Sequence, residues 1–437
     1  MKKVVKKVAL LLIVFGIGVG VTLLYMNNKY KVYEEEKPKQ IKKHVDTISM
    51  MLETEAGSGN YEMTTASSWP TDGYVFNATL SKCENGGELS WDDTNKRVLM
   101  SGNVSDKCYV YFDVIQVLLA DYVKSLYTGT QGENGIYYHD AILTNGAGDN
   151  SYRYSGTDPN NYVCFGTNTT PCPTDNLYRM IGVFGDQVKL VKYDYANSNL
   201  LGTNGDYSGT GTYSTSGYST YKGSLTTINR YYWNDSTDTN TWSESNLNKI
   251  NLNTNFITNI GEEWVNKIAT TTWKVGGNTA EKIRGSAMYI AYQNEITNAV
   301  TTNTTDGAKE YSAQIGLMYV SDYGYAASPT YWTYYGYNSD STKDYRAATT
   351  SNWMYMGLDE WTISRRAAVS NSAFYVANGG FVHFNGVYHD DHLPSSIGNG
   401  FGVRPSFNLL SSITYISGDG TQNSPIIINW TMYIPIR

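Results

Sequence analysis

Charge is scarce in this chain, and the little basic charge it has is confined to one end. Charged residues make up 17% of the 437 residues, and the formal net charge is −7 at neutral pH. No block of Lys and Arg occurs beyond the first 45 residues. Binding of nucleic acid requires a basic face, so we expect no nucleic-acid partner.

Long apolar runs are also scarce, since the chain has one, from Val8 to Met26, behind a lysine-rich start. This run is just long enough to span a bilayer as a helix, and the preceding lysines favour a cytoplasmic N-terminus. A cleaved signal peptide and a pilin-type leader are the alternatives. No small-x-small cleavage site follows Leu24, and no acidic residue lies early in the run. We therefore predict an uncleaved anchor over residues 1–26, a single pass through the cell membrane, and an extracellular location for the rest.

Cysteine is limited to four residues, and none follows Cys172. An even number of cysteines in an exported chain is typical of disulfides. Three pairings are possible, and proximity in the sequence favours Cys83 with Cys108 and Cys164 with Cys172. No CxxC spacing occurs, so the cysteines do not indicate a zinc site.

What the chain has in abundance is Tyr, Gly, Asn, Thr and Ser. Tyr occurs 39 times and Gly 41 times, and aromatic residues make up 14% of the chain. Such a composition is typical of short strands and turns rather than of a helical enzyme. The aromatic content also excludes a disordered chain.

Four segments follow the anchor. Residues 27–59 resemble a stalk, with a short helix predicted between Lys39 and Glu55 from apolar residues at helical spacing. Residues 60–113 alternate in strand fashion and predict a small disulfide-stapled β-domain. Residues 114–425 form the main domain, and residues 426–437 are left as a tail.

The main domain mixes helices and strands, which makes the fold class α+β. We predict helices at 114–127, from Ser243 onward and within 279–296, a hairpin over 179–192 with its turn at Gly185, and a buried strand at 314–320. Short strands are predicted at 361–364, 373–376, 381–384 and 403–409.

Several motifs of the main domain resemble a known family. They are Ile315-Gly-Leu-Met-Tyr-Val-Ser-Asp-Tyr-Gly-Tyr325, Trp353, Glu360-Trp-Thr-Ile-Ser-Arg365, Ala373-Phe-Tyr-Val376, Gly402-Val-Arg-Pro-Ser-Phe-Asn-Leu409 and Ser417-Gly-Asp-Gly-Thr-Gln-Asn-Ser-Pro425. They resemble bacterial surface proteins with a C-type-lectin fold, related to formylglycine-generating enzymes and including the variable target proteins of diversity-generating retroelements. The resemblance implies a C-type-lectin-like domain of short strands with two or more helices, preceded by the small β-domain and the transmembrane helix.

The resemblance also implies that residues from about Arg366 to Asp391 form a ligand-facing surface. Diversified family members vary there among Asn, Tyr, Ser, Asp, His, Gly, Ala and Phe, and this set dominates the stretch from Ser370 to Asp391. The residues to which we assign ligand contacts are Tyr375, Asn378, Phe381, His383, Asn385, Tyr388 and His389. Structural roles are assigned to Trp353, Trp361, Arg404 and Pro405, with Arg404 tying loops through its several donors.

The chain departs from the catalytic branch of the family, which uses cysteines in its C-terminal half. We therefore expect no catalytic residues and no cofactor. His383, His389 and His392 cluster with two aspartates, but without a metal-binding spacing, so we predict no metal site. The predicted function is adhesin- or receptor-like binding of a protein or glycan on a host, phage or neighbouring cell. The alternatives are a cell-envelope enzyme that uses other catalytic groups, and a structural envelope or pilus-associated protein.

Overall fold

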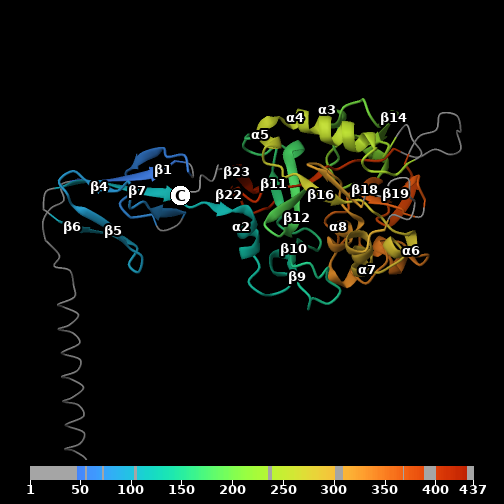
Figure 1. Ribbon diagram of the computed structural model, residues 1–437, viewed down its shortest axis with the longest axis horizontal. Helices are drawn as coiled ribbons and strands as arrows, with labels where there is room; N and C mark the ends of the chain where they lie inside the picture. Colours follow the sequence, from blue (N-terminus) through green and yellow to red (C-terminus); the bar gives the residue numbers. More distant parts are fainter. Residues whose placement is uncertain are drawn as a thin grey trace, which may run out of the picture. The chain divides into compact units, whose positions relative to one another are not determined.

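The computed structural model describes residues 47–54, 57–70, 73–102, 106–234, 239–300, 309–367, 369–387 and 400–430. The described chain mixes helices with several small sheets, which confirms the α+β class. It divides into two compact units, Met1–Ile115 and Gln116–Arg437, each of which is described by itself (Figure 1).

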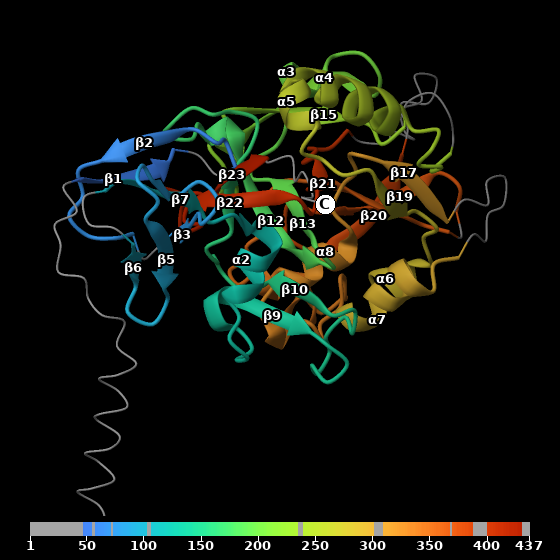
Figure 2. The same cartoon turned by 60° about the vertical axis from the view of Figure 1, so that its left-hand side comes forward.

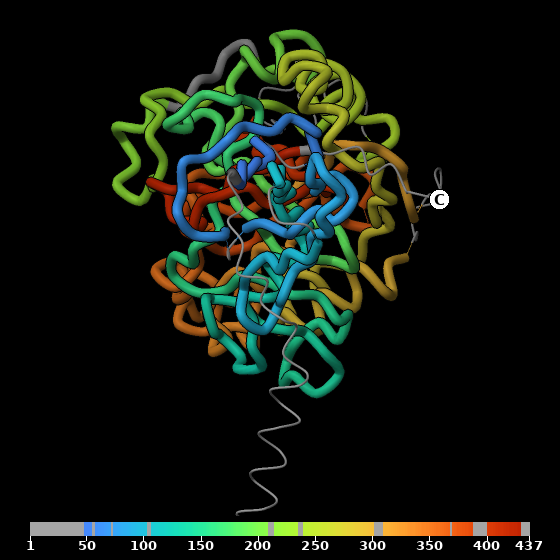
Figure 3. The backbone as a smooth tube through the Cα atoms, turned by 90° about the vertical axis from the view of Figure 1, so that its left-hand side faces the viewer, coloured from blue at the N-terminus to red at the C-terminus, as the bar shows by residue number. Residues whose placement is uncertain are grey.

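The smaller unit is built on a five-stranded sheet in the order β2–β1–β7–β3, with β4 also paired to β7. Its strands can be followed in Figure 3, where the unit is blue to cyan. The strands are β1 (Thr47–Glu53), β2 (Tyr61–Thr64), β3 (Tyr74–Phe76), β4 (Lys82–Cys83), β5 (Glu88–Asp92), β6 (Arg97–Ser101) and β7 (Lys107–Val114). The predicted disulfide between Cys83 and Cys108 is present and joins β4 to β7.

The short helix predicted between Lys39 and Glu55 is wrong where it is described, because β1 is a strand paired in parallel with β7. Apolar residues at 48 and 52 have the spacing of a helix, but the apolar residues at 48, 50 and 52 also alternate as in a strand. Met50 packs against Val110 and Phe112 of β7 in the unit's core. Long-range pairing therefore decides the conformation, and residues 47–53, expected in the stalk, belong to the β-domain.

The larger unit has a six-stranded sheet in the order β21–β13–β12–β10–β9, with β11 also paired to β12. These strands are β9 (Ile136–His139), β10 (Ser151–Tyr154), β11 (Tyr162–Cys164), β12 (Leu177–Phe184), β13 (Gln187–Lys192) and β21 (Ser406–Asn408). The hairpin β12–β13 with its turn at Gly185 is confirmed, as is the disulfide between Cys164 and Cys172.

Three helices of the larger unit lie close together. The views in Figures 1 and 2 agree that α3, α4 and α5 lie together on the side of the unit away from β9. The α- and π-helices of this unit are α2 (Leu119–Ser125), α3 (Ser198–Leu201), the π-helix η4 (Leu247–Phe256), α4 (Ile257–Ile260), α5 (Glu262–Val265), α6 (Ala280–Ile283), α7 (Met288–Tyr292), the π-helix η5 (Gln293–Thr297) and α8 (Val320–Tyr325). The helix predicted after Ser243 is confirmed and ends at Gly261, whose φ of 84° favours glycine.

Two predicted elements of this unit need correction. The helix predicted over 114–127 begins only at Leu119, because β7 runs to Val114 and β8 (Val117–Leu118) pairs with β22. The strand predicted over 314–320 is also wrong. Gly316 forms an isolated bridge with Ser406, and the chain then turns into α8. The apolar run is buried on every side, and such a run does not distinguish a strand from irregular core structure.

The remaining sheets are small. Their strands are β14 (Tyr207–Ser214), β15 (Thr227–Tyr231), β16 (Thr271–Lys274), β17 (Glu310–Ala313), β18 (Glu360–Arg365), β19 (Ser372–Val376), β20 (Val382–Gly386), β22 (Ile413–Ser417) and β23 (Ile427–Trp430). The strand β23 lies within the expected tail and pairs with β22, so the larger unit continues to residue 430.

None of the helices in the described part of the chain has both the length and the apolar character needed to cross a bilayer. The predicted anchor over residues 1–26 lies outside the described residues.

Candidate ligand-binding site

Three of the residues predicted to contact ligand share one face of the sheet β18–β19–β20. Cross-strand pairing places Tyr375 opposite His383 and Ala373 opposite Asn385. Because alternate strand residues point to the same side, Tyr375, His383 and Asn385 lie on one face. All three side chains are only partly buried. The structure therefore brings these predicted residues together on regular strands.

The aromatic side chains of this face rest on a buried layer. The ring of Tyr375 lies 4.4 Å from that of Phe401 and 6.2 Å from that of Trp361, both of which are buried. The ring of His383 lies 6.2 Å from Tyr375 and 6.1 Å from Phe381. Since the layer beneath is packed, the half-exposed rings are held in defined positions.

The other predicted contact residues do not lie on the strand positions that form this face. Asn378 is exposed on the turn between β19 and β20, and its backbone N–H donates to Asp359 Oδ1 at 2.8 Å. Its carbonyl oxygen accepts a hydrogen bond from the Tyr355 hydroxyl. Tyr388 and His389 lie outside the described residues.

The residues assigned structural roles are all buried. Trp353 and Trp361 are buried, and each indole N–H donates to a backbone carbonyl at 2.8 Å. The guanidinium of Arg404 donates to Glu360 Oε1 and to the carbonyl of Met354, each at 2.7 Å. The carbonyl of Pro405 accepts from the backbone N–H of Lys192. These contacts join distant segments of the chain.

Three arginine residues lie beside these rings, and two of them, Arg284 and Arg346, were not predicted. The guanidinium of Arg284 lies 4.8 Å from the ring centroid of Tyr337 and 4.7 Å from that of Phe384. The guanidinium of Arg366 lies 3.8 Å from the same Phe384 centroid. Arg346 lies over Tyr337 and Phe381 at 5.4 and 5.3 Å.

The backbone explains this convergence. The N–H of Val382 in β20 donates to the carbonyl of Gly336, and the N–H of Tyr337 donates to the carbonyl of Arg284. Three segments about fifty residues apart in sequence therefore run beside one another. Arg366 marked the start of the predicted surface, whereas no pattern around Arg284 or Tyr337 indicates a site. We use the name "β20 face" for the surface around the edge strand β20 that is formed by Arg284, Tyr337, Arg366, Tyr375, Phe381, His383, Phe384 and Asn385. Phe384 alternates with His383 and Asn385 along the strand, so this surface continues around the edge of the sheet.

Charge on the β20 face is unbalanced. Arg346 forms an ion pair with the buried Asp344 at 2.6 Å. Among the described residues, Arg284 and Arg366 have no ion pair within 4.0 Å, and Arg284 Nη1 and Arg366 Nε are buried without a hydrogen-bond partner. The exposed carboxylate of Glu281 acts on both arginines, and its own pKa is lowered chiefly by a backbone hydrogen bond and also by both arginines.

The shifts in pKa reflect this unbalanced charge. Burial lowers the pKa of Arg366, and the neighbouring Arg284 lowers it further. Burial also lowers the pKa of His383, a hydrogen bond to the carbonyl of Phe384 opposes the shift, and both arginines add to it. His383 is therefore neutral near pH 7, and the field around it is positive.

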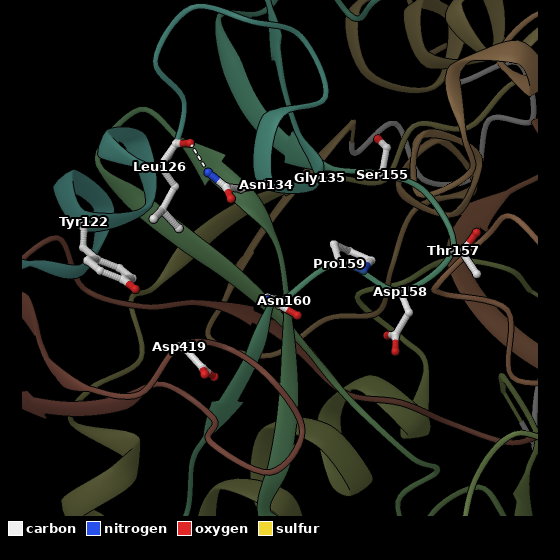
Figure 4. A pocket seen from close by; sticks show the side chains of 10 residues that line it. All are labelled: Tyr122, Leu126, Asn134, Gly135, Ser155, Thr157, Asp158, Pro159, Asn160 and Asp419. Atoms are coloured by element: carbon white, nitrogen blue, oxygen red, sulfur yellow. Dashed lines mark hydrogen bonds between the residues drawn. The ribbon is translucent and has the colours of Figure 1, made fainter.

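A groove elsewhere on the larger unit has the opposite character (Figure 4). It encloses about 530 Å³. Its lining consists of Tyr122, Leu126, Asn134, Gly135, Ser155, Thr157, Asp158, Pro159, Asn160 and Asp419. The carboxylate of Asp158 pairs with Arg179 at 2.8 Å, whereas Asp419 is exposed and accepts the backbone N–H of Thr421 at 2.9 Å. The groove is neutral to acidic and would not attract an anion.

A smaller cavity of about 180 Å³ contains buried charges that are already paired. Lys189 contacts Asp322 at 2.5 Å, and Arg153 contacts Asp149 at 2.6 Å. Burial alone would raise the pKa of Asp149, but Arg153 and hydrogen bonds from Ser151 and Tyr292 outweigh it and lower that pKa. Because Asp149 stays ionised and paired, it is poorly suited to act as a general acid or base.

Among the described residues, the only cluster with metal-ligand geometry is Cys83, Asp106 and Cys108. Both cysteines are consumed by a disulfide, which removes their thiolates as ligands. Most of the histidine–aspartate cluster near His383 lies outside the described residues.

Comparison with known proteins gives no relative: no family model, no curated protein and no solved structure matches the chain.

Proposed function

We propose that this chain is a membrane-anchored, surface-displayed binding protein of the C-type-lectin-like kind, and that its ligand is a protein or glycan outside the cell. The observation that carries the proposal is the β20 face itself. Half-exposed Tyr375, Phe381 and His383 lie on regular strands or beside them, and Tyr375 packs on the buried rings of Trp361 and Phe401. Rigid aromatic side chains give a large contact area at a low cost in conformational entropy.

Two features support binding over catalysis. The carboxylates in the small cavity are held in ion pairs, as described for Asp149 and Asp322. The β20 face, by contrast, combines ring faces, an amide at Asn385 and arginine donors, which are the groups that recognition surfaces use. The anchor and the disulfide-stapled β-domain would hold the binding unit outside the membrane.

The proposal is tested with the full chain, purified in detergent and applied to arrays of glycans and cell-surface proteins. The variant Tyr375→Ala/Phe381→Ala/His383→Ala removes three rings of the β20 face. The control, Tyr138→Ala/Tyr152→Ala, removes two partly buried rings that stack 4.6 Å apart on β9 and β10 of the same unit.

We expect the first variant to lose at least tenfold in affinity for any ligand that the array detects, and the control to keep it. Tryptophan fluorescence would confirm that both variants remain folded. If the triple variant bound every detected ligand as well as the unmodified chain, the β20 face would not be the binding site.

A further inference from the structure

We infer that the β20 face recognises an anionic saccharide, whose carboxylate or sulfate group is bound by Arg284 and Arg366. This inference rests on the proposed function, because it names the ligand class of the same site.

The two guanidinium groups share one aromatic ring. Both lie over the ring of Phe384, at 4.7 and 3.8 Å from its centroid. A guanidinium that stacks on a ring keeps its N–H donors at its own edge, because the donors lie in the guanidinium plane. Stacking therefore fixes the two groups without using their donors.

Neither Arg284 nor Arg366 forms an ion pair with a described residue, since Glu281 acts on both only from beyond ion-pair distance. The neighbouring Arg346, by contrast, is held by Asp344 at 2.6 Å. One nitrogen of each unpaired arginine is buried with no acceptor. Partly buried like charges repel each other unless an anion lies between or beside them. An anion at this point would accept from both guanidinium edges and relieve that repulsion.

The surroundings of the two arginines are aromatic and polar. Tyr337, Phe381 and Tyr375 present partly exposed rings, and Asn385 presents an amide. Ring faces suit the C–H groups of a sugar, while amides suit its hydroxyl groups. The two hollows described above are lined by other residues.

The acidic groove around Tyr122 provides an internal contrast. It offers an aromatic ring and amides too, but the exposed carboxylate of Asp419 would repel an anion. The choice between a neutral and an anionic sugar is therefore made by the arginines and not by the rings.

The test uses hyaluronan, an uncharged dextran of similar length, and poly-glutamate as immobilised probes for the full chain at about 0.15 M salt. The variants are Arg284→Gln, Arg366→Gln and the double variant. The control is Arg97→Gln, which removes an exposed arginine of the smaller unit that pairs with Asp92.

We expect hyaluronan to bind and dextran to bind at least tenfold more weakly. Each single glutamine variant should lose about tenfold in affinity, the double variant should lose nearly all binding, and Arg97→Gln should have no effect. The variant Arg284→Lys/Arg366→Lys keeps the charge but not the fork of donors, so it should fall between the two. If the glutamine variants failed to fold, the loss of affinity in this lysine variant would still test the role of the two arginines.

A second readout does not depend on affinity. Bound anion neutralises part of the field that lowers the pKa of His383, so the NMR titration of its ring should move to higher pH when hyaluronan is present. The double glutamine variant should show a raised pKa of His383 even without ligand.

Several results would overturn the inference. They are equal binding of dextran and hyaluronan, unchanged binding by the double glutamine variant, and binding of poly-glutamate in preference to hyaluronan. Asp390 and Asp391 follow β20 in the sequence, so binding seen only in Asp390→Asn/Asp391→Asn would show that the chain's own carboxylates occupy the arginines. If the array ligand were lost with the aromatic variant but kept with the arginine variants, the binding face would stand and only its ligand class would be wrong.

Discussion

Replacing Arg404 with Met should destabilise the larger unit more than most single substitutions do. Arg404 and Glu360 are almost completely buried, with 1% and 2% of their side chains exposed, and their atoms Nε and Oε1 lie 2.7 Å apart. Removing the guanidinium leaves the carboxylate buried without its charge partner, and it also frees the carbonyl of Met354. Breaking such a pair costs about 3–5 kcal/mol of the free energy of unfolding.

The loss should depend on pH. Burial raises the pKa of Glu360, and Arg404 opposes that rise. Without Arg404 the folded-state pKa lies well above the unfolded value of about 4.3. A carboxyl whose folded pKa is raised binds more protons in the folded state, so stability falls as pH rises between those two values. The deficit of Arg404→Met should therefore be smaller at pH 5 than at pH 8.

Urea unfolding of the full chain followed by tryptophan fluorescence measures this effect, because eight of the ten tryptophans belong to residues 116–437. The matched control is Arg404→Met/Glu360→Gln, which removes the carboxylate that would be stranded. It should recover part of the lost stability and show no dependence on pH beyond that of the unmodified chain. A loss below 1 kcal/mol for Arg404→Met, or equal losses at pH 5 and pH 8, would refute the reasoning.

Three further changes are expected to act on stability. Burial lowers the pKa of Lys192 in the folded protein to about 8. Between pH 8 and about 10.4 this lysine therefore binds more protons in the unfolded chain, and stability should rise with pH by about 3 kcal/mol in total. Urea unfolding of Lys192→Met should show no such rise. Reduction of the Cys83–Cys108 bridge, which closes a 25-residue loop, should cost about 3.5 kcal/mol, seen as faster hydrogen exchange in β7 but not in the larger unit. Gly316→Ala would place its methyl group 2.7–2.8 Å from ring atoms of Trp273, and we expect a loss of about 1–3 kcal/mol, with unchanged exchange in the smaller unit as its control.

Local patterns predicted the elements whose partners are close in sequence. The hairpin β12–β13 carries its own turn at Gly185, and its strands are adjacent, so alternation and turn chemistry suffice. The same holds for the helix that ends at Gly261. The strand β1 was missed because its partner β7 lies about sixty residues away, and an apolar spacing that fits both a helix and a strand does not reveal that partner.

The strand predicted before α8, over residues 314–320, was wrong for a different reason. Residues 315–320 are buried on every side, and periodicity then carries no information on conformation. Asp322 decides the outcome, because its carboxylate accepts the backbone N–H of Tyr319 and starts the helix there. A capping residue shortly after the apolar run was the available signal.

In the candidate site, too, the residues of one contiguous stretch were predicted, and the residues brought in from distant parts of the sequence were not. Tyr375, His383 and Asn385 were predicted from one contiguous stretch, and strand pairing places them on one face. Arg284 and Tyr337 reach that face only because the segments at 284, 337 and 382 are joined by backbone hydrogen bonds. Nothing in their own sequence neighbourhood distinguishes them from any exposed arginine or tyrosine.

This difference bears on how the face would change in evolution or in the laboratory. Residues 372–386 supply ring faces and an amide, and substitutions there would alter which uncharged groups are contacted. Arg284 lies outside that stretch, on a segment fixed by the backbone of Tyr337, and its charge acts on whatever occupies the face. If the anionic preference comes from Arg284 and Arg366, it should persist through substitutions of Tyr375 or Asn385 that change affinity. Preference for charge and preference for shape would then be separable properties of one surface, because they reside on different segments of the chain.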